Sequence, residues 1–172
     1  MVRVEKLTAA EAAAELPALT DLLLDAVDSG ASLGFLPPPE TSDVRQYWNE
    51  VIHAIDGGNR ILIVAFRDED LVGSVQLDLA AKPNTSHRAE VMKHFIYRKA
   101  QRQGIAKTLL NALDLAAKGA GGNLLILDTR QVDPSEHLYL SLGFRHAGVI
   151  PQCARSGSGI LYSTVSLYCE LD

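Results

Sequence analysis

The stretch HFIYRKAQRQGIAKTLL, residues 94–110, leads from a predicted strand into a predicted helix. Apolar residues recur at helical spacing after Gly104, which marks the start of the helix. Arg102 and Lys107 flank this glycine, so the turn is basic although the whole chain carries a net charge of −5. A basic turn at the start of a helix predicts a binding site for an anion.

Phosphate groups are the anions that this turn suits. The first amides of a helix have no partners inside the helix and can donate to an anion. Gly104 has no side chain to keep a bulky anion away from the backbone, and Ala106 keeps a second position small. Two common phosphate-binding patterns, GxxxxGK[ST] and GxGxxG, are absent from the sequence. The turn therefore predicts a phosphate site of another kind.

The elements beside this turn predict a mixed sheet. The strand at 88–97 and an apolar strand at 123–129 are joined by one helix, from about 104 to 118. Such a crossover makes the two strands parallel neighbours or near neighbours. Further strands are predicted at 2–7, 60–66, 71–79, 145–151 and 160–169. Further helices are predicted from the Thr8–Glu11 capping box to about residue 28, after a cap at Ser42 or Asp43, and after a cap at Asp133.

Composition narrows the class of protein. The chain has 172 residues, 47% of them apolar, as expected for one globular domain spanning 1–172. The negative net charge argues against a nucleic-acid-binding protein. No apolar run is long enough for a membrane span, and nothing resembles a signal peptide, so we expect a cytoplasmic protein. Cys153 and Cys169 lie outside any metal-binding spacing and are expected to be reduced thiols.

The turn resembles a known motif. Gln101-x-x-Gly104-x-Ala106 is similar to the [RQ]-x-x-G-x-[GA] motif of the GNAT acetyltransferases, whose loop amides hold the pyrophosphate of coenzyme A. Tyr139-x-x-x-Gly143-Phe144 resembles a second motif of that family, and the order of elements is similar along nearly the whole chain. By this resemblance, the residues that bind acetyl-CoA are Gln101, Arg102, Gln103, Gly104, Ile105, Ala106 and Lys107, with the main chain of His94, Phe95 and Ile96 along the pantetheine arm.

The resemblance implies both a fold and an activity. The fold is the α/β (α+β) GNAT fold, a mixed and mostly antiparallel sheet of about seven strands with about four helices. Its central parallel strands are splayed at the acyl-CoA site. The activity is acetyl-CoA-dependent transfer of an acetyl group to a primary amine, with acetyl-CoA as cosubstrate and without a metal ion.

One branch of the family is more similar than the rest. GASLGF (30–35), KPNTSHRAEVMK (82–93), LDTR (127–130) and Cys153 resemble the tabtoxin resistance proteins. This resemblance implies a small acceptor, amino-acid-like or a β-lactam antimetabolite.

Two positions depart from the family pattern. Arg98 stands where many members have proline, which we expect to be harmless, and Val132 stands where many have Asn or Gly, which predicts the loss of a polar contact to the pantetheine.

Two carboxylates are candidates for removing the proton of the amine. Glu90 lies early in the predicted strand at 88–97, and Asp128 lies near the end of the strand at 123–129. Close carboxylates raise one another's pKa, which suits a general base. The equivalent residues of the tabtoxin resistance branch are its proposed bases. The alternative is that Asp128 orders the following loop and that Glu90 pairs with Arg88 or Lys93.

Tyr139 is the candidate that assists departure of the thiolate, mainly because of its position in the family. The alternative is a half-buried tyrosine that packs on Phe144. His94 has the same strand parity as Glu90, so both are expected on one face. A packed or hydrogen-bonded histidine is favoured over a base at this position. Trp48 is expected in the core rather than in an acceptor pocket.

Three functions are consistent with these residues. The favoured one is an N-acetyltransferase that acts on a small-molecule amine, because the segment 29–39 could cover a pocket. The alternatives are a protein N-acetyltransferase and a CoA-binding regulatory module without catalysis. The expected partners are the small amine and, as one further option, a second copy in a homodimer.

Overall fold

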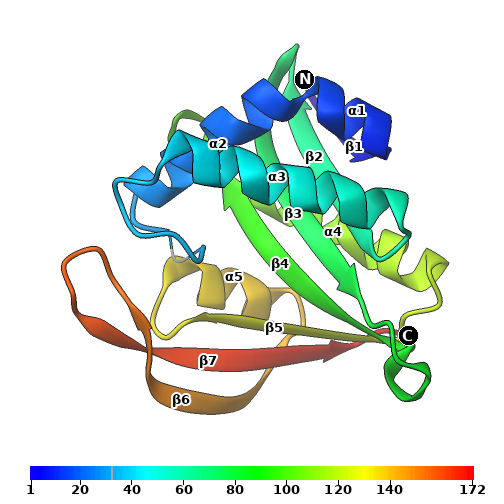
Figure 1. Cartoon of the computed structure of the whole chain (residues 1–172). Coiled ribbons are helices and arrows are strands. Elements are labelled where there is room, and N and C mark those ends of the chain that lie inside the picture. The colour runs from blue at the N-terminus through cyan, green and yellow to red at the C-terminus, as the bar shows by residue number, and fades with distance from the viewer. Residues whose placement is uncertain (32) are drawn as a thin grey trace.

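The computed structural model describes residues 1–31 and 33–172, and its centre is a seven-stranded sheet in the order β1-β2-β3-β4-β5-β7-β6 (Figure 1). All neighbouring strands are antiparallel except β4 and β5, which are parallel. The strands are β1 (Val2–Leu7), β2 (Arg60–Arg67), β3 (Asp70–Leu79), β4 (Arg88–Ile96), β5 (Leu124–Arg130), β6 (Arg145–Arg155) and β7 (Leu161–Glu170). The predicted mixed, mostly antiparallel sheet is confirmed.

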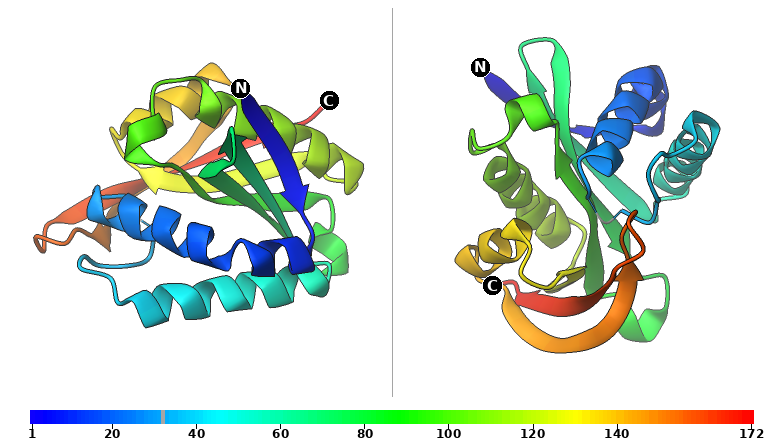
Figure 2. Two further views of the ribbon diagram at one scale, coloured as in Figure 1. Left: turned by 90° about the horizontal axis from the view of Figure 1, so that it is seen from above. Right: turned by 90° about the vertical axis from the view of Figure 1, so that its left-hand side faces the viewer.

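Helices cover both faces of the sheet, as the end-on view in Figure 2 shows. One core lies between β1–β4 and the first three helices and contains the fully buried Trp48, as predicted. A second core lies under α4. The helices are α1 (Ala9–Ala14), α2 (Leu16–Asp28), α3 (Thr41–Asp56), α4 (Ile105–Gly119) and α5 (Pro134–Ser141), with short 3₁₀ turns η1 (Pro83–Thr85) and η2 (Arg98–Ala100). No helix of the described residues is long and apolar enough to cross a membrane.

Two helix starts differ from the predictions. Thr8 and Glu11 form the predicted capping box, but the helix that follows breaks at Glu15, so the described chain has five α-helices rather than about four. Pro17 causes this break because it has no N–H to continue the ladder of hydrogen bonds, whereas proline is favourable in the first turn of a new helix. The cap of α3 is Glu40, not Ser42 or Asp43, and its side chain makes no capping hydrogen bond.

Arg98 makes a contact that proline could not. Its backbone N–H donates to Asp25 Oδ2 at 2.9 Å, and its Nε donates to Asp25 Oδ1 at 3.0 Å. Asp25 lies on α2, so these two hydrogen bonds link the turn after β4 to a helix of the first core. The departure from the family pattern at Arg98 therefore replaces a stiff turn by a tertiary contact.

The central parallel strands are paired only at their start. Arg88, Ala89 and Glu90 of β4 align with residues 124–126 of β5, and the pairing ends there. Beyond this point β4 stays paired with β3 through Ile96, whereas β5 stays paired with β7 through Arg130. The two strands therefore separate, as Figure 1 shows. The splay that the family resemblance implies is confirmed.

A β-bulge lies in β4 where the strands separate. The pairs Ser74–Phe95 and Gln76–Met92 enclose one residue on β3 and two on β4, and Lys93 has a φ of 51°. An extra residue reverses the alternation of faces along a strand. His94 consequently faces the side of α4 and α5, while Glu90 faces the side of α1–α3. The prediction that these two residues share a face is wrong for this reason.

Val132 has a backbone conformation that is unfavourable for valine. Its φ is 61°, in the left-handed region, where a β-branched residue is rare. Asn and Gly adopt this region most readily. The family preference for Asn or Gly at this position therefore has a backbone explanation, and the loss of a polar contact to pantetheine stays a prediction.

We predict that Val132→Asn stabilises the protein. Relief of the left-handed strain should raise the free energy of unfolding by about 1 kcal/mol, and the melting temperature by about 2–4 °C for a chain of this size. Val149→Asn is the matched control, because Val149 is also exposed but has no positive φ. Thermal unfolding without ligands measures both. A melting temperature for Val132→Asn no higher than that of the parent protein would contradict the explanation.

Candidate functional site

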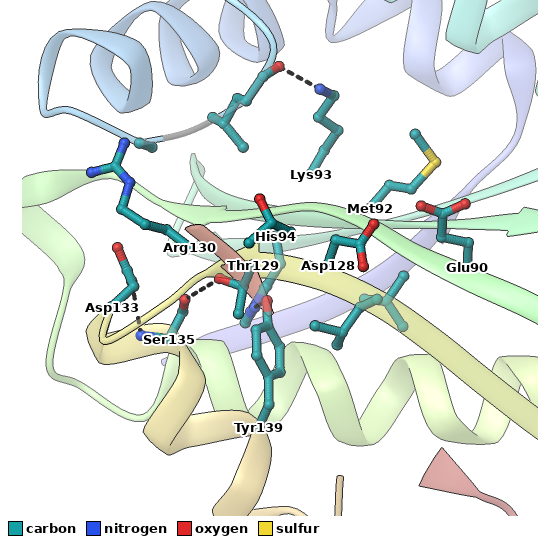
Figure 3. A pocket seen from close by; sticks show the side chains of 15 residues that line it. Glu90, Met92, Lys93, His94, Asp128, Thr129, Arg130, Asp133, Ser135 and Tyr139 are labelled. Atoms are coloured by element: carbon teal, nitrogen blue, oxygen red, sulfur yellow. Dashed lines mark hydrogen bonds between the residues drawn. The ribbon is translucent and has the colours of Figure 1, made fainter. Parts of the chain in front are cut away.

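A cavity of about 320 Å³ lies where β4 and β5 separate (Figure 3). Its walls come from β4, β5, the start of α5 and the segment after α2, with one residue of β7. Four residues predicted from the sequence line it, namely Glu90, His94, Asp128 and Tyr139. The other lining residues are Ala31, Leu33, Val91, Met92, Lys93, Leu127, Thr129, Arg130, Asp133, Ser135 and Thr164.

Glu90 and Asp128 lie on the same side of the cavity (Figure 3). Glu90 is paired with Ile126, and Asp128 follows two residues later, so the alternation along β5 gives it the face of Ile126. Burial raises the pKa of Glu90, and the negative charge of Asp128 raises it further. Among the described residues Glu90 forms no salt bridge, so the alternative pairing with Arg88 or Lys93 is not seen.

The environment of Asp128 differs from that of Glu90. Ser166 of β7 donates a hydrogen bond from its Oγ to Asp128 Oδ1 at 2.5 Å. This bond holds the Asp128 carboxylate at the edge of the cavity. The raised pKa of Glu90 makes Glu90 a suitable candidate for the proton acceptor.

Tyr139 and His94 form a buried pair on the opposite side of the strands. The Tyr139 hydroxyl lies 3.1 Å from His94 Nδ1, and the rings are 5.8 Å apart. Burial lowers the pKa of His94 to about 4, so the imidazole is neutral at physiological pH, and burial raises the pKa of Tyr139. Tyr139 also packs on Phe144 with a centroid distance of 5.7 Å, as the alternative interpretation expected.

The protons of this pair can be arranged in two ways. With its proton on Nδ1, His94 donates to the Tyr139 oxygen, and the hydroxyl proton is free to point into the cavity. With its proton on Nε2, His94 accepts from the hydroxyl instead. Nε2 is buried without a hydrogen-bond partner among the described residues, although the Ala106 backbone is close enough to offset part of the fall in the pKa of His94. A neutral, buried histidine is not suited to act as the base.

The predicted phosphate turn lies outside the cavity, at the start of α4. Gly104 caps the helix with a φ of 80°, and no side chain caps the first amides. A Cβ placed on Gly104 would meet nothing within 4 Å, so the space in front of these amides is open. In the described chain the amides of residues 105–107 donate to no other group. This geometry fits an anion held by backbone amides.

The side chains of the turn divide into two groups. Gln101 Nε2 donates to the Ile96 carbonyl at 3.2 Å, Gln103 Oε1 accepts from Arg67 at 3.1 Å, and Ile105 is buried in the core. These three side chains are occupied by the protein, so only their main chain is available to a ligand. Arg102 and Lys107 are exposed and can supply charge.

In β4, the residues that were predicted to lie along the pantetheine arm also have side chains that are occupied by the protein. Phe95 and Ile96 are buried in opposite cores, and His94 is engaged with Tyr139. The edge of β4 that faces β5 has no partner strand beyond Glu90. Any contact of these residues with a ligand would therefore be made by the main chain, which is the form of contact predicted from the sequence.

Sequence reasoning missed two cationic residues of the cavity, Lys93 and Arg130. Arg130 could have been found, because it follows Asp128 by two positions and shares its strand face. Lys93 could not, because its position depends on the bulge.

The described residues contain no group of three or more His, Cys, Asp or Glu side chains that could hold a metal ion. The quoted segment 30–35 includes residue 32, which lies outside the described residues.

Comparison with known proteins gives one family. Residues 24–144 match the model of the acetyltransferase (GNAT) family. An uncharacterized N-acetyltransferase of Azospirillum brasilense, from the hisH–hisA intergenic region, is 32% identical over 119 residues, which are 68% of this chain and 69% of the relative.

Solved structures show the same fold. The ribosomal-protein-alanine N-acetyltransferase of Brucella melitensis has a TM-score of 0.81 at 23% identity, covering 98% of this chain and 99% of that one. The yncA protein of Salmonella typhimurium, solved with its cofactor acetyl-CoA, has a TM-score of 0.81 at 17% identity, covering 100% and 95%. At these identities the likeness establishes the fold alone.

We predict that Gly104→Val removes most of the affinity for acetyl-CoA, because the new side chain would fill the open space in front of the amides. Left-handed strain is a second effect of this substitution, since Gly104 has a φ of 80°. Gly121→Val is the matched control, because Gly121 lies beyond the other end of α4 with a φ of 81° and equally open surroundings. Calorimetric titration with acetyl-CoA measures both variants. Equal affinity in the two would show that the turn does not hold the ligand.

Proposed function

Because the chain belongs to the acetyltransferase (GNAT) family, we propose that it transfers the acetyl group of acetyl-CoA to a primary amine of a small molecule. The observation that carries this proposal is the pair Glu90 and Asp128 on one face of the separating strands, with Tyr139 on the other. Following the resemblance to the tabtoxin resistance branch, the acceptor is an amino-acid-like or β-lactam-type amine.

Acetyl-CoA would bind along the gap between the strands. The amides of residues 105–107, with Arg102 and Lys107, would hold its pyrophosphate, and the free edge of β4 would hold the pantetheine arm. The amides of residues 105–107 suit the pyrophosphate because they have no hydrogen-bond partner and lie at the positive end of the helix dipole. Bound acetyl-CoA supplies the activated thioester.

The amine must lose a proton before or during attack. An alkyl amine with a pKa of about 10 is mostly charged at neutral pH, so the carboxylates would attract it as an ammonium ion. We assign the base to Glu90, because burial and Asp128 raise the pKa of this carboxyl toward the working pH. Asp128, held by Ser166, would keep the negative charge that stabilises the ammonium.

Tyr139 would assist the leaving thiolate. Its hydroxyl lies at the wall of the cavity, and its raised pKa keeps it protonated across the physiological range. A protonated hydroxyl can donate a hydrogen bond, or a proton, to the sulfur as charge develops. His94 would position the hydroxyl through the 3.1 Å contact without itself exchanging the proton.

The proposal has further parts. The chain would act as one domain over residues 1–172, in the cytoplasm, without a metal ion and without nucleic acid or membrane as a partner. A homodimer is one form in which it could do so. The small size of the cavity favours a small amine over a folded protein, and the segment after α2 meets the β6–β7 loop at a neighbouring cavity that shares Ala31 and Arg130 with it. A Cβ on Gly157 would lie 2.5 Å from Pro37 Cγ, so these two segments touch.

The direct test is a screen of amines with acetyl-CoA, with release of free thiol as the readout. Amino acids, polyamines, β-lactam-like amines and a peptide with a free N-terminus form the panel, and a reaction without amine is the control. Turnover with a small amine supports the proposal. Turnover with the peptide alone would favour a protein N-acetyltransferase, and binding of acetyl-CoA without turnover of any amine would favour a regulatory module.

We predict distinct pH–rate profiles for the two carboxylate variants. In the parent, activity should fall as pH falls through the pKa of Glu90, which lies above its ordinary value of 4.5. Glu90→Gln should lower kcat by about 10²–10⁴-fold at neutral pH and abolish this acid limb. Asp128→Asn should shift the limb to lower pH, because it removes one of the charges that raise the pKa of Glu90.

The double variant tests the coupling. Glu90→Gln with Asp128→Asn should lose less activity than the product of the two single losses, because paired groups are not additive. The loss should shrink as pH rises toward the pKa of the amine, since free amine then arrives without help. An acid limb unchanged from the parent in all three variants would show that the proton goes elsewhere.

We predict that Tyr139→Phe lowers kcat and leaves the Michaelis constant for acetyl-CoA nearly unchanged, as expected for loss of a contact made only in the transition state. The substitution keeps the packing on Phe144 but leaves His94 without its hydroxyl partner. Steady-state kinetics and acetyl-CoA calorimetry separate the two effects. An unchanged kcat, with chemistry shown to limit turnover, would reduce Tyr139 to a packing residue.

A further inference from the structure

The cavity contains two cationic side chains, Arg130 and Lys93, besides the carboxylates Glu90, Asp128 and Asp133. Arg130 is the last residue of β5 and follows Asp128 by two positions, so the two side chains leave the same face of the strand. Their Cα atoms are about 7 Å apart at this spacing. Figure 3 shows Arg130 and Lys93 directed toward the segment after α2, with Glu90 and Asp128 farther along the strands.

Arg130 is held in place but its donors are largely unused. Its guanidinium stacks on the Tyr162 ring, with Cζ 4.4 Å from the centroid. Nη2 reaches the Gly30 carbonyl only at 3.5 Å, and Nε is buried without a hydrogen-bond partner among the described residues. No carboxylate of the described chain forms a salt bridge with Arg130. A fixed guanidinium with free donors is suited to bind a carboxylate.

Asp133 is the nearest competitor along the chain, but it is engaged elsewhere. It lines the same cavity, and its Oδ1 accepts a hydrogen bond from the backbone N–H of Ser135 at 3.0 Å, where it caps α5. Among the described residues, neither Asp133 nor another carboxylate lies within salt-bridge distance of Arg130.

Lys93, on β4, supplies a second cation to the wall of the cavity. Its Nζ donates a hydrogen bond to the Leu33 carbonyl, which leaves two of its three protons for other acceptors. Burial lowers the pKa of Lys93, and the positive charge of Arg60 lowers it further, as expected for an ammonium without an anionic neighbour. An anion bound in the cavity would reverse part of this effect.

We propose that Arg130 and Lys93 form a subsite for a carboxylate of the acceptor, so that the acceptor is an amine with a carboxylate a few bonds from its reacting nitrogen. This inference rests on the proposed function, because it takes the cavity as the acceptor site. Glu90 and Asp128 on one side and the free donors of Arg130 on the other match the two charges of an amino acid. A neutral or polycationic amine would leave the guanidinium of Arg130 without an anion.

The space beyond Arg130 is available for the rest of such a molecule. A second cavity, of about 630 Å³, shares Ala31 and Arg130 with the first and continues toward the β6–β7 loop. Arg130 therefore stands at the junction of the two cavities. The side chain of an amino acid held by its carboxylate at Arg130 could extend into the second cavity.

The experiment compares each of the twenty L-amino acids with its C-terminal amide. Both sets are tested for acetyl transfer, and both are titrated by calorimetry into the CoA-loaded protein, so that binding is measured independently of turnover. The acids should be preferred by about 10²-fold or more, because the amide removes a charge-assisted, two-point contact. Arg130→Gln should reduce this preference to near unity, and Arg130→Lys should restore part of it.

Arg155→Gln is the matched control. Arg155 is exposed and lines only the second cavity, so its loss removes the same charge nearby without changing the subsite. Unchanged affinity of Arg130→Gln for acetyl-CoA shows that the variant is folded. If that variant does not fold, Lys93→Gln and the preference of the parent decide the question.

The outcomes separate this inference from the proposed function. Acids that bind through Arg130 without being acetylated would support the subsite and contradict the proposed function. Acetylation of polyamines but not of amino acids would support the function and overturn the subsite. Amides that bind or react as well as acids, a full preference for acids in Arg130→Gln, or no binding of either set would also overturn it.

Discussion

The end of pairing between β4 and β5 at Glu90 is the constraint on which the rest of the site depends. A backbone edge without a partner is costly when it is buried and costs little when a ligand or water can satisfy it. Here β4 is held by β3 on its other edge and β5 by β7, so the gap is maintained by the sheet itself. Two rigid halves therefore define the cavity, and neither half needs to move to form it.

The bulge at Lys93 gives the gap two different sides. Before it, Glu90 faces the first three helices, and after it, His94 faces α4 and α5, where Tyr139 meets it. The proposed base, Glu90, and the proposed proton donor to the thiolate, Tyr139, thus lie on opposite sides of one strand edge. A direct transfer needs this separation, because the amine approaches the carbonyl carbon of the thioester from one side and the sulfur departs from another.

Much of the fold could be predicted from local sequence. Period-two strands, the Thr8–Glu11 capping box and the Asp133 cap all have short-range causes, and the structure has them. The break at Glu15 depends on Pro17, and the position of Lys93 depends on a register shift against β3. The first is a local signal that the sequence prediction did not use, whereas the second cannot be recognised in one short pattern. A bulge arises from pairing between strands, so its effect on His94 was visible only in the assembled sheet.

The candidate site, too, could be predicted from the sequence only in part. Glu90, Asp128 and Tyr139 were predicted from their positions in a family pattern, and the structure brings them to one cavity. Arg130 belongs to the same strand face as Asp128, yet its role as an unpaired cation depends on Tyr162 and Gly30, which are distant in sequence. Charge balance inside a cavity is a property of the fold, because it depends on which side chains fail to meet a partner.

A crystal structure of the protein with bound coenzyme A would show whether the ligand occupies the gap between β4 and β5. We expect the pyrophosphate at the amides of residues 105–107, the pantetheine along the free edge of β4, and the sulfur within hydrogen-bonding distance of the Tyr139 hydroxyl. Coenzyme A bound away from Gly104, or β4 and β5 paired beyond Glu90 in the complex, would contradict this expectation.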